Sequence, residues 1–560
     1  MKYTDVITAG AKCFFPIDEN IFDYYIRNTN QYGEYNVFCH YGVNHKKSEF
    51  VADIKSLTAY IHEELGLKKG DCYTVFMPTN VESVMFLYAL NRLGVITALV
   101  HPQTPPAVLK KMLAFTKSKG IAILDMFLTP FAPVISECGI SCVACVPATY
   151  AYPDKCSAPA KPEAIEAGKS IAQFITFPEI LKKYAGKDAP SEALSSCKDD
   201  VAIYMHGGGT TGESKTIKLT NYNLNWVTWM TTDDNTPKTE PGVDTTICCM
   251  PLFHAFGLVA AAFAALHEGA KAVFMPVFDA DNFIKVLKTE KVREFNGVPN
   301  MYRKLIAHPE FDGPHLANVE SIYCGGDALD KAAQERLREI LRKNGSYAEV
   351  CQGYGLTECC AVDIVNRPWD NKPGSIGVPQ RGLTVEIRDE DMKRVNNGEI
   401  GEIVISGPVV MQGYLTEDGP VDDGVYYDEK GKAWIRSGDL GYMDDEGFVF
   451  FVGRKKRVVI ISGYNVYPRD IEVLLSEMPE IKEACAVQGY AGTSPIVRLF
   501  LVLNDENTDK SALEEKIAKA CESKISKFAV PREYKYIDAL PRTKLDKIDF
   551  MSLSQFKPEA

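Results

Sequence analysis

The sequence predicts an α/β protein of more than one domain, and three observations lead to that prediction. Residues 50–150 alternate helix-like and strand-like segments, and residues 200–350 repeat this alternation. From about residue 380, short apolar runs lie between turn residues, which is typical of a small β subdomain. After Arg457, helical and strand-like runs mix over a short length. The alternation indicates a largely parallel sheet covered by helices, and the final segment indicates a compact α+β domain.

The first elements can be placed from their apolar spacing. Residues 51–65 have helical periodicity and end near Gly66, and residues 81–93 form a second predicted helix that a glycine closes. Residues 73–77 are predicted to form a short strand between these helices. Residues 152–198 are rich in Ala, Pro, Ser and Lys, so we expect an excursion over the surface there.

The later elements follow a different pattern. Short strands are expected over residues 399–407 and 447–453, between turn residues. A helix is expected after Pro468, because apolar residues repeat at the spacing i, i+3, i+4 and i+7, namely Ile471, Leu474, Leu475 and Met478. The basic cluster at residues 454–457 lies between two strand-like runs and is the predicted domain boundary.

Charge and apolar segments exclude several classes of protein. The 560 residues include 62 Lys and Arg against 74 Asp and Glu, a net charge of −12. An acidic chain has no overall attraction for nucleic acid or an anionic membrane, so neither is an expected partner. The most apolar segment, residues 256–266, is expected to be a buried helix, since a membrane span needs about 20 apolar residues. The first residues lack the apolar run of a secretory signal, which favours a cytoplasmic protein.

The cysteines allow two interpretations. Sixteen are scattered along the chain, often in apolar runs, which favours buried thiols in a reducing compartment. Cys138, Cys142 and Cys145 have the C-x3-C-x2-C spacing of a radical iron–sulfur enzyme. Alternatively, residues 140–146 are a strand in which the thiols fill space. Such a strand points Cys142 and Cys145 to opposite faces, and we therefore favour it over a cluster site.

A strand-like run at residues 201–205 leads into a loop equipped to hold a polyphosphate. The loop contains Gly207, Gly208, Gly209, Thr210, Thr211, Gly212 and Lys215. Glycines let backbone N–H groups approach a phosphate closely, hydroxyls add short donors, and the lysine adds positive charge. The loop is not a Walker A motif, because Glu213 and Ser214 separate Gly212 from Lys215. Taken alone, such a loop is more often a plain turn.

Three distant segments carry groups that suit the same ligand. Residues 352–358 offer a tyrosine that can stack on a flat ring, a threonine for a phosphate oxygen and a carboxylate for Mg²⁺. Residues 437–441, followed by residues 453–454, offer an aspartate on a tight turn that can accept both ribose hydroxyls. Residues 540–549 are a charged segment near the carboxy terminus. Each has a simpler explanation alone, respectively a glycine-rich strand end, an Asp turn and a solvated tail.

Together these segments resemble the adenylate-forming superfamily, which includes acyl-CoA synthetases, peptide-synthetase adenylation domains and firefly-type luciferases. The similarity covers nearly the whole chain and keeps the family's order of motifs. The other segments that carry it are Lys68-Lys69-Gly70-Asp71, Pro251-Leu252-Phe253-His254, Gly325-Gly326-Asp327-Ala328-Leu329, Gly453-Arg454-Lys455-Lys456 and Ile461-Ser462-Gly463-Tyr464-Asn465-Val466-Tyr467-Pro468. Within the superfamily, the chain looks most similar to acyl-CoA synthetases, the AMP-forming acid–CoA ligases.

The resemblance implies an architecture and an activity. Residues 1–454 are expected to form a large amino-terminal domain of two αβ halves plus a β-barrel-like subdomain, which binds the adenylate and the acyl group. Residues 455–457 are the expected hinge, with Lys456 at its centre, and residues 458–560 the small, mobile α+β catalytic domain. The implied reaction activates a fatty or aryl acid with ATP to an acyl-adenylate, releasing pyrophosphate, and then transfers the acyl group to coenzyme A. ATP, Mg²⁺ and coenzyme A are the implied cofactors.

The resemblance also assigns roles to single residues. The implied catalytic residues are Lys547, Thr357 and Glu358, and Glu358 is also the implied Mg²⁺ ligand. The implied nucleotide-binding residues are Thr210, Thr211, Gly212, Lys215, Gly325, Gly326, Asp327, Tyr354, Gly355, Asp439 and Arg454. Acyl or CoA contacts are implied for His254, Gly463 and Tyr464, although a core histidine is an equally good interpretation of His254. In the family the small domain swings after the first step, so that the thiol gains access.

The chain departs from the family's usual pattern in four places. Gly207-Gly208-Gly209 stands where Thr-Ser-Gly is common, and Ser214 where proline is common. Leu545-Asp546 precedes the catalytic lysine in place of Ser-Gly, and Arg457 replaces a frequent acidic residue beside the hinge. These changes put the rate in question more than the type of reaction.

Two alternative functions stay open from the sequence. One is an acyl-AMP ligase that delivers its product to a separate carrier protein, and the other is a catalytically silent nucleotide-binding homologue. The intact Glu358, Asp439 and Lys547 argue against the silent homologue. Pocket walls are expected from three mostly small and apolar segments, residues 254–257, 296–298 and 323–325, which favours a neutral hydrophobic acyl group. The identity and length of the acid and the oligomeric state, with a homodimer as one option, stay open.

Overall fold

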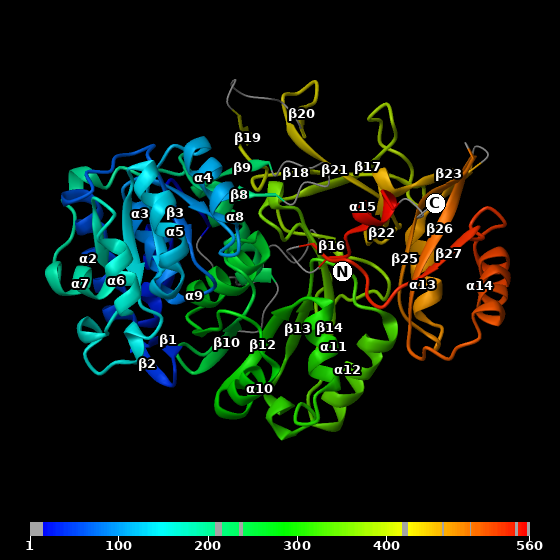
Figure 1. The fold of residues 1–560 in the computed structure, drawn as a ribbon, viewed down its shortest axis with the longest axis horizontal. Coiled ribbons are helices and arrows are strands. Elements are labelled where there is room, and N and C mark those ends of the chain that lie inside the picture. The colour runs from blue at the N-terminus through cyan, green and yellow to red at the C-terminus, as the bar shows by residue number, and fades with distance from the viewer. Residues whose placement is uncertain are drawn as a thin grey trace.

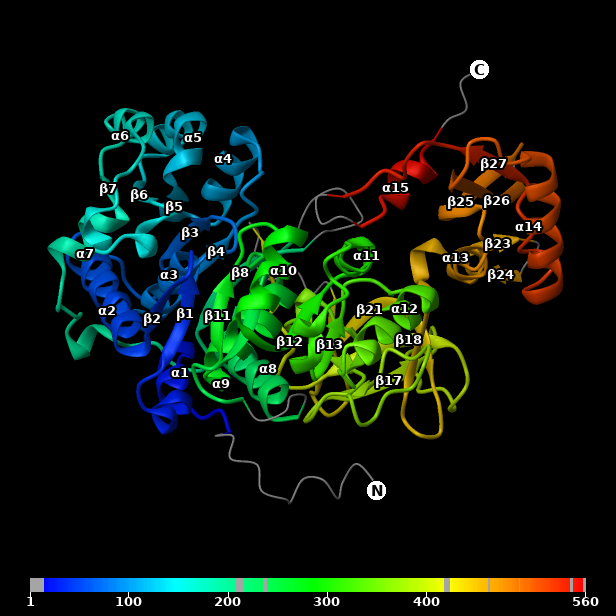
Figure 2. The ribbon, with the colours of Figure 1, turned by 90° about the horizontal axis from the view of Figure 1, so that it is seen from below.

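The structure of the protein is a computed structural model that describes residues 15–207, 215–234, 239–416, 424–461, 464–492, 494–543 and 547–556. Two large sheets with their helices and a β subdomain form the amino-terminal part, and a smaller domain follows at the carboxy-terminal end (Figures 1 and 2). This arrangement confirms the predicted α/β fold class.

The first αβ half is built on an eight-stranded sheet with the order β19-β9-β8-β4-β3-β5-β6-β7. Neighbours from β8 to β7 pair in parallel, whereas β9 and β19 run antiparallel to their neighbours. The strands are β3 (Cys72–Phe76), β4 (Ile96–Leu99), β5 (Ser118–Leu124), β6 (Ser141–Cys145), β7 (Phe174–Thr176), β8 (Val201–His206), β9 (Thr216–Thr220) and β19 (Tyr414–Leu415). The helices are α2 (Lys47–Glu63), α3 (Val81–Arg92), α4 (Pro106–Phe115), α5 (Asp125–Cys138), α6 (Pro162–Gly168) and α7 (Phe177–Lys183). The predicted elements at residues 51–65, 73–77, 81–93 and 201–205 are thereby confirmed as α2, β3, α3 and β8.

The prediction of a surface excursion over residues 152–198 was wrong in part. The middle of this segment forms β7, which is the edge strand of the sheet, and α7. Composition misled because the few apolar side chains of α7 are concentrated on its buried face, at Phe177, Ile180 and Leu181. A capping box between Thr176 and Glu179 starts this short helix and was a readable signal.

The second αβ half is built on a nine-stranded sheet with the order β16-β15-β14-β13-β12-β10-β11-β1-β2. Its strands are β1 (Asn36–His40), β2 (Val43–Lys46), β10 (Asp244–Cys248), β11 (Lys271–Phe274), β12 (Lys291–Gly297), β13 (Ser321–Cys324), β14 (Glu349–Tyr354), β15 (Ile364–Val365) and β16 (Val378–Pro379). Its helices are α8 (Asn221–Asp234), α9 (Ala264–Glu268), α10 (Ala280–Thr289), α11 (Pro299–Ala307) and α12 (Lys331–Lys343), and α1 (Ile21–Thr29) precedes β1. Strands β12, β13 and β14 pair in parallel, so their carboxyl ends lie along one edge.

The apolar segment at residues 256–266 is buried, as predicted. The geometry of its backbone was not predicted. Residues Gly257–Phe263 form a π-helix that continues into α9. A Cβ on Gly257 would lie 2.3 Å from the carbonyl oxygen of Pro251, so only glycine fits where this helix begins. Because π-helical turns are frequent at functional sites, this segment draws attention to the strand ends beside it.

The β subdomain and the carboxy-terminal domain complete the fold. The subdomain sheet contains β17 (Thr384–Arg388), β18 (Gly401–Ser406), β20 (Val425–Tyr427), β21 (Ala433–Met443) and β22 (Val449–Arg454). The last domain contains β23 (Val459–Ile461), β24 (Tyr464–Val466), β25 (Ile481–Ala491), β26 (Ser494–Leu503), β27 (Glu533–Tyr536), α13 (Pro468–Ser476), α14 (Lys510–Lys524) and α15 (Phe550–Ser554). The predicted strands at residues 399–407 and 447–453 and the helix after Pro468 are confirmed as β18, β22 and α13.

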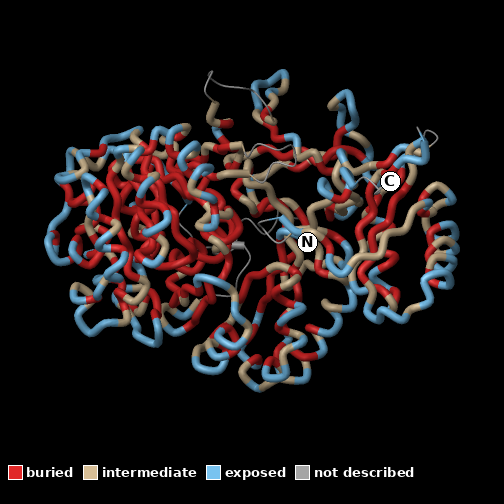
Figure 3. The backbone as a smooth tube through the Cα atoms, viewed as in Figure 1, coloured by how far each residue is buried: buried red, intermediate tan, exposed pale blue. Residues whose placement is uncertain are grey.

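Buried residues, red in Figure 3, form several separate apolar cores. The carboxy-terminal domain has its own core, in which Ile471, Leu474 and Leu475 of α13 pack against β26 and α14. Cys142 and Cys145 of β6 lie in two different apolar clusters, as the strand interpretation predicted. Every cysteine among the described residues is a free thiol, and no cluster of metal-ligating side chains occurs among those residues.

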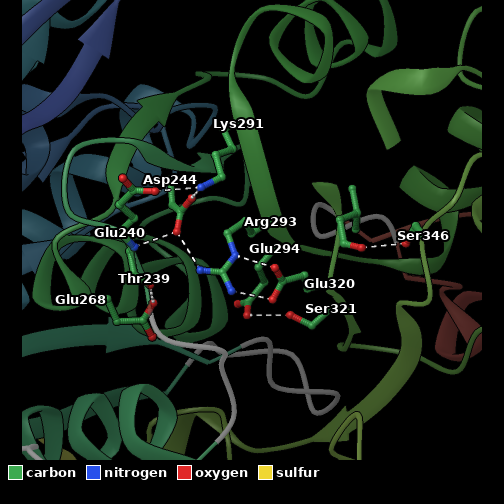
Figure 4. Close-up of polar contacts among 11 residues, drawn as sticks. Thr239, Glu240, Asp244, Glu268, Lys291, Arg293, Glu294, Glu320, Ser321 and Ser346 are labelled. Atoms are coloured by element: carbon green, nitrogen blue, oxygen red, sulfur yellow. Dashed lines mark hydrogen bonds and ion pairs between the residues drawn. The ribbon is translucent and has the colours of Figure 1, made fainter. Parts of the chain in front are cut away.

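A polar network fixes the amino-terminal ends of the central strands (Figure 4). Arg293 of β12 contacts Asp244 of β10 at 2.7 Å and also pairs with Glu320, which precedes β13. Ser321 donates a hydrogen bond of 3.0 Å to Glu294 on the neighbouring strand. These contacts lie at the ends of the strands opposite to Gly297, Cys324 and Tyr354. The network therefore stabilises the sheet at the amino-terminal ends of its strands and leaves the carboxyl ends available for functional groups.

Candidate active site

A buried aspartate forms one wall of the site. Asp439 of β21 is opposite Arg454 of β22 in the strand register and has no exposed side-chain surface. The Tyr354 hydroxyl donates to Asp439 Oδ2 at 2.6 Å, and the Arg454 guanidinium lies 2.8 Å from Oδ1. Burial raises the pKa of Asp439, and the Arg454 charge and the Tyr354 hydrogen bond oppose that rise. Strand pairing brings Asp439 and Arg454 together, and a hydrogen bond joins Tyr354 to them. Three predicted nucleotide-binding residues thus meet at one place.

Two details of this wall differ from the sequence prediction or add to it. Asp439 lies within strand β21 rather than on a tight turn, although Gly438 before it has a φ of 69°. The prediction was wrong here because the strand runs through Gly438. Asp439 Oδ1 is buried and ion-paired with Arg454 at 2.8 Å, and a carboxylate oxygen can accept a further hydrogen bond beside such a pair. An acceptor of this kind, next to a guanidinium, suits a ligand hydroxyl.

A second group of predicted residues meets through a tyrosine that the sequence did not single out. Glu358 lies on a short 3-10 turn, Thr357–Cys359, and its Oε1 accepts a 2.9 Å hydrogen bond from the Tyr414 hydroxyl. The Lys215 ammonium lies 4.6 Å from the centre of the Tyr414 ring. Tyr414 reaches both because β19 pairs with β9 just after the glycine-rich loop. The contacts of Tyr414 with Glu358 and Lys215 depend on long-range strand pairing, so a local sequence pattern could not predict them.

The backbone between Gly355 and Asp363 is tightly constrained. A Cβ on Gly355 would lie 1.9 Å from the Ala361 carbonyl oxygen, and Cys360 and Ala361 both have left-handed φ values, 62° and 79°. Non-glycine residues in this region store strain that the surroundings must hold in place. Asp363, which the sequence prediction missed, provides part of that support, because its Oδ2 accepts a 3.0 Å hydrogen bond from the Leu356 N–H. Burial raises the pKa of Asp363.

The loop after β13 forms the edge of the site next to the predicted acyl walls. The φ of Gly326 is 80°, and a Cβ on Gly325 would lie 3.2 Å from the ring of Phe256. Phe256 begins the buried segment and covers this glycine, so one predicted wall residue packs on one predicted nucleotide-binding residue. Asp327 is exposed, and its Oδ1 accepts a 2.8 Å hydrogen bond from the Ala328 N–H.

His254 lies near the same edge and carries no charge at neutral pH. Burial and, to a smaller extent, the positive charge of Lys547 lower the pKa of His254 to about 4. Its Nδ1 accepts a 3.3 Å hydrogen bond from the Phe256 N–H. A neutral histidine adds no positive charge to the predicted acyl pocket.

Lys547 is delivered by the carboxy-terminal domain, whose final red segment extends toward the large domain in both ribbon views (Figures 1 and 2). Burial lowers the pKa of the Lys547 ammonium, the Arg454 charge lowers it further, and Asp327 and Asp439 oppose the change. The loop is held locally by the Thr543 N–H, which donates to the Lys547 carbonyl at 2.7 Å. The pKa of Lys547 is thus affected by charged groups on β21, on β22 and on the loop after β13. These groups belong to the large amino-terminal part.

Several predicted site residues are not brought together with these. Thr210, Thr211, Gly212 and Gly463 lie outside the described residues. Lys456 is exposed on the single 3-10 turn Lys455–Arg457 that links β22 to β23. Tyr464 is 58% exposed and stacks on Phe528 of its own domain, with ring centres 4.1 Å apart. Tyr464, the described residue of the predicted CoA contacts, is therefore largely exposed in this structure, whereas Lys547 is partly buried.

Comparisons with known proteins show to which family the chain belongs. The sequence profile of the AMP-binding enzyme family matches residues 27–415, and that of the AMP-binding enzyme C-terminal domain matches residues 470–547. The chain belongs to the AMP-binding enzyme family. The match confirms the resemblance that the motifs predicted.

Curated relatives of this AMP-binding enzyme are similar over nearly their full length. A long-chain-fatty-acid–CoA ligase of Bacillus subtilis is 29% identical over 91% of this chain and 89% of its own. One from Escherichia coli O157:H7 is 27% identical over 88% and 87%. A probable 4-coumarate–CoA ligase 3 of Dictyostelium discoideum is 27% identical over 91% and 90%.

Solved structures share the fold. The anthranilate CoA ligase AuaEII in complex with anthranoyl-AMP has a TM-score of 0.80 at 20% identity, covering 99% of this chain and 98% of its own. ATP-bound MatB from Rhodopseudomonas palustris has a TM-score of 0.78 at 22% identity, covering 96% of this chain and 99% of its own. At such identities the likeness concerns the fold.

These findings establish the type of reaction. The protein is an AMP-forming acid–CoA ligase, which activates a carboxylic acid as an acyl-adenylate and transfers the acyl group to CoA. ATP and CoA are the co-substrates of this reaction, as predicted. Among the described residues, no helix is long and apolar enough to cross a membrane.

Proposed function

We propose that the predicted site residues divide the work of adenylation between the two domains, with Lys547 as the catalytic residue of the small domain. The observation that supports this proposal is the electrostatic coupling of Lys547 to Asp439, Arg454 and His254 across the two parts of the chain. A carboxylate is a poor electrophile without a leaving group, and attaching AMP to it supplies one. A positioned ammonium between the attacking carboxylate and the α-phosphate stabilises the negative charge that is greatest in the transition state.

The β subdomain residues are proposed to hold the nucleoside. Asp439 Oδ1, which is ion-paired with Arg454, accepts a further hydrogen bond from a ribose hydroxyl. Tyr354 stacks on adenine while its hydroxyl stays on Asp439. Gly325, Gly326 and Gly355 let the backbone approach the base closely.

The triphosphate is proposed to lie over the loop that begins after β8, where Lys215 adds positive charge and Thr357 a hydroxyl. Thr210, Thr211 and Gly212 are assigned to the β- and γ-phosphates on their motif alone. The residues present fit Mg²⁺, because Glu358 offers a carboxylate that Tyr414 orients, and Mg²⁺ is usually held by one or two carboxylates plus phosphate oxygens. When bound, Mg²⁺ neutralises phosphate charge.

The domain boundaries are also a proposal: residues 1–454, a hinge at 455–457, and residues 458–560. It is supported by the separate core of the last domain and by the single turn that joins it to β22. The exposed Tyr464 supports a swing about Lys456, since a loop that serves the CoA thiol must move toward the site after adenylation.

The acid is proposed to be a fatty acid with a neutral hydrophobic chain. Support comes from the curated relatives with long-chain fatty acids in their names and from the buried, apolar π-helical segment beside Phe256. We further propose a cytoplasmic location, which the free thiols among the described cysteines support.

A screen of pyrophosphate release tests the substrate. The purified protein is given ATP, Mg²⁺ and unbranched acids of graded length, with 4-coumarate and anthranilate as aryl acids, each with and without CoA. We expect pyrophosphate release with long unbranched acids and acyl-CoA formation when CoA is present. Preference for an aryl acid would replace the fatty-acid proposal, and acyl-adenylate that is never passed to CoA would contradict the CoA-ligase assignment.

A further inference from the structure

An arginine of the small domain lies over an aromatic ring of the large one. The Arg469 guanidinium, on the first turn of α13, lies 4.9 Å from the ring centre of Phe451 on β22. The Phe451 ring is in turn 6.1 Å from the ring of Tyr354, at an interplanar angle of 35°. Tyr354 donates its hydrogen bond to Asp439. A series of side-chain contacts therefore connects Arg469 of the small domain with Asp439, which is proposed to bind the nucleoside.

The position of Arg469 on α13 does not by itself favour a positively charged side chain. It follows Pro468 at the amino-terminal end of α13, where the helix dipole disfavours a positive charge. Burial lowers the pKa of Arg469, and the largest opposing effect comes from Asp327 on the loop after β13. Glu472 and Asp470 of its own helix oppose the lowering less, and the two groups of the large domain that favour the guanidinium are Phe451 and Asp327. A cation that is partly removed from water interacts more strongly with an aromatic face.

We propose that Arg469 is a positioning residue, which holds the small domain in the orientation for adenylation by packing on Phe451. The inference rests on the proposed roles of Lys547 and Tyr354 and on the hinge at 455–457. Phe451 precedes the hinge and Arg469 follows it, so a swing about the hinge separates them. The contact thus belongs to the orientation in which Lys547 is inside, and it favours the first half-reaction only.

The test measures the two half-reactions separately in Arg469→Ala, Arg469→Lys and wild type. Adenylation is followed as acid-dependent ATP–pyrophosphate exchange, and thioester formation as acyl-CoA produced from synthetic acyl-adenylate and CoA. We expect Arg469→Ala to slow exchange about 3- to 30-fold, as expected for loss of a cation–π contact, and to leave the thioester step within about twofold. Arg469→Lys keeps a cation and should recover most of the exchange rate.

A double-mutant cycle identifies the partner. Phe451→Leu and Arg469→Ala should be strongly non-additive in exchange, because each alone removes the same contact. Lys510→Ala is the matched control: it removes a cation 4.7 Å from the Tyr536 ring within the small domain, and both half-reactions should be unchanged.

The outcomes separate this inference from the proposed function. Equal losses in both half-reactions, no loss in exchange, or additive effects of Phe451→Leu and Arg469→Ala would each overturn the role of Arg469. Absence of exchange by the wild type with every acid would instead refute the proposed function. Melting temperatures exclude misfolding, since a structural role would lower the melting temperature and both rates together.

Discussion

The nucleotide side of the active site and the lysine side are held in different ways. Asp439 and Arg454 face each other across a strand pair, and Tyr354 is hydrogen-bonded to that aspartate. Lys547 lies in a loop of the small domain that is held by contacts within that domain, including two hydrogen bonds with Thr543. If the proposed roles hold, the difference teaches that groups needed in both half-reactions are built into a sheet, whereas the group needed in one is carried by the small domain.

The most severe test of this contrast is Lys547→Ala. We expect adenylation to fall by about 10² to 10³, by analogy with the loss of a transition-state hydrogen-bond donor, because the charge on the α-phosphate loses its compensation. Conversion of a supplied acyl-adenylate to acyl-CoA should stay near the wild-type rate. Single-turnover measurements of the two steps provide the check, and an equal loss in both would place Lys547 with the fixed groups.

Substitution of the fixed group should behave in the opposite way. Asp439→Asn keeps the shape of the side chain but removes the charge that Arg454 pairs with. We expect affinity for ATP to fall about 10- to 150-fold, the range for a hydrogen bond to a charged group of about 1.5–3 kcal/mol. The thioester step should also suffer, since acyl-adenylate carries the same ribose. Isothermal titration with a non-hydrolysable ATP analogue and kinetics with supplied adenylate measure the two effects, and a normal thioester step would argue against ribose binding by Asp439.

Substitutions at Lys456 test whether the proposed hinge links the two regions. Lys456→Pro restricts the backbone on the turn Lys455–Arg457 and should slow the thioester step about tenfold, equivalent to about 1.4 kcal/mol on its barrier, more than it slows adenylation. Lys456→Ala keeps the backbone free and serves as the control. If the proline variant forms acyl-CoA from supplied adenylate at the rate of the alanine variant, Lys456 is not a pivot.

The sequence predicted the site better where a contact is local or carried by a motif. The roles of Asp439 and Arg454 came from motifs, and the helix after Pro468 came from spacing alone. Tyr414 was missed because its neighbours, Glu358 and Lys215, meet it only when β19 joins the sheet. Asp363 was missed for a similar reason, since a buried carboxylate beneath a turn has no signature in spacing.

The surface excursion was predicted from composition, and composition does not report which face of a short helix is buried. The π-helical geometry after Phe256 also has no sequence pattern of its own, because its residues are apolar on every side. Periodicity thus predicted most of the elements, and the motifs selected Tyr354, Asp439 and Arg454, which the structure brings into contact. Contacts that depend on three-dimensional pairing had to come from the structure.

The smallest expected effect concerns a carboxyl group in the fixed part, away from the nucleotide residues. Glu82 on α3 is fully buried, and neither of its oxygens has a hydrogen-bond partner within the described part of the structure. Burial raises the pKa of Glu82 from 4.5 to about 8. The folded state therefore keeps a proton that the unfolded state loses, so this group's contribution to stability is complete below about pH 4.5 and is lost as the pH rises toward 8.

Glu82→Gln removes this titration and keeps the shape of the side chain. We expect the wild type to lose stability between pH 6 and 8 by up to about 1.4 kcal/mol per pH unit more than the variant, measured by urea unfolding at each pH. Glu446→Gln, which changes an exposed carboxylate, is the control and should follow the wild type. The ratio of the two half-reaction rates should be the same in all three proteins, because a change within the rigid part does not alter the orientation of the small domain. A shift in that ratio would mean that the two regions are coupled through the core as well as through the hinge.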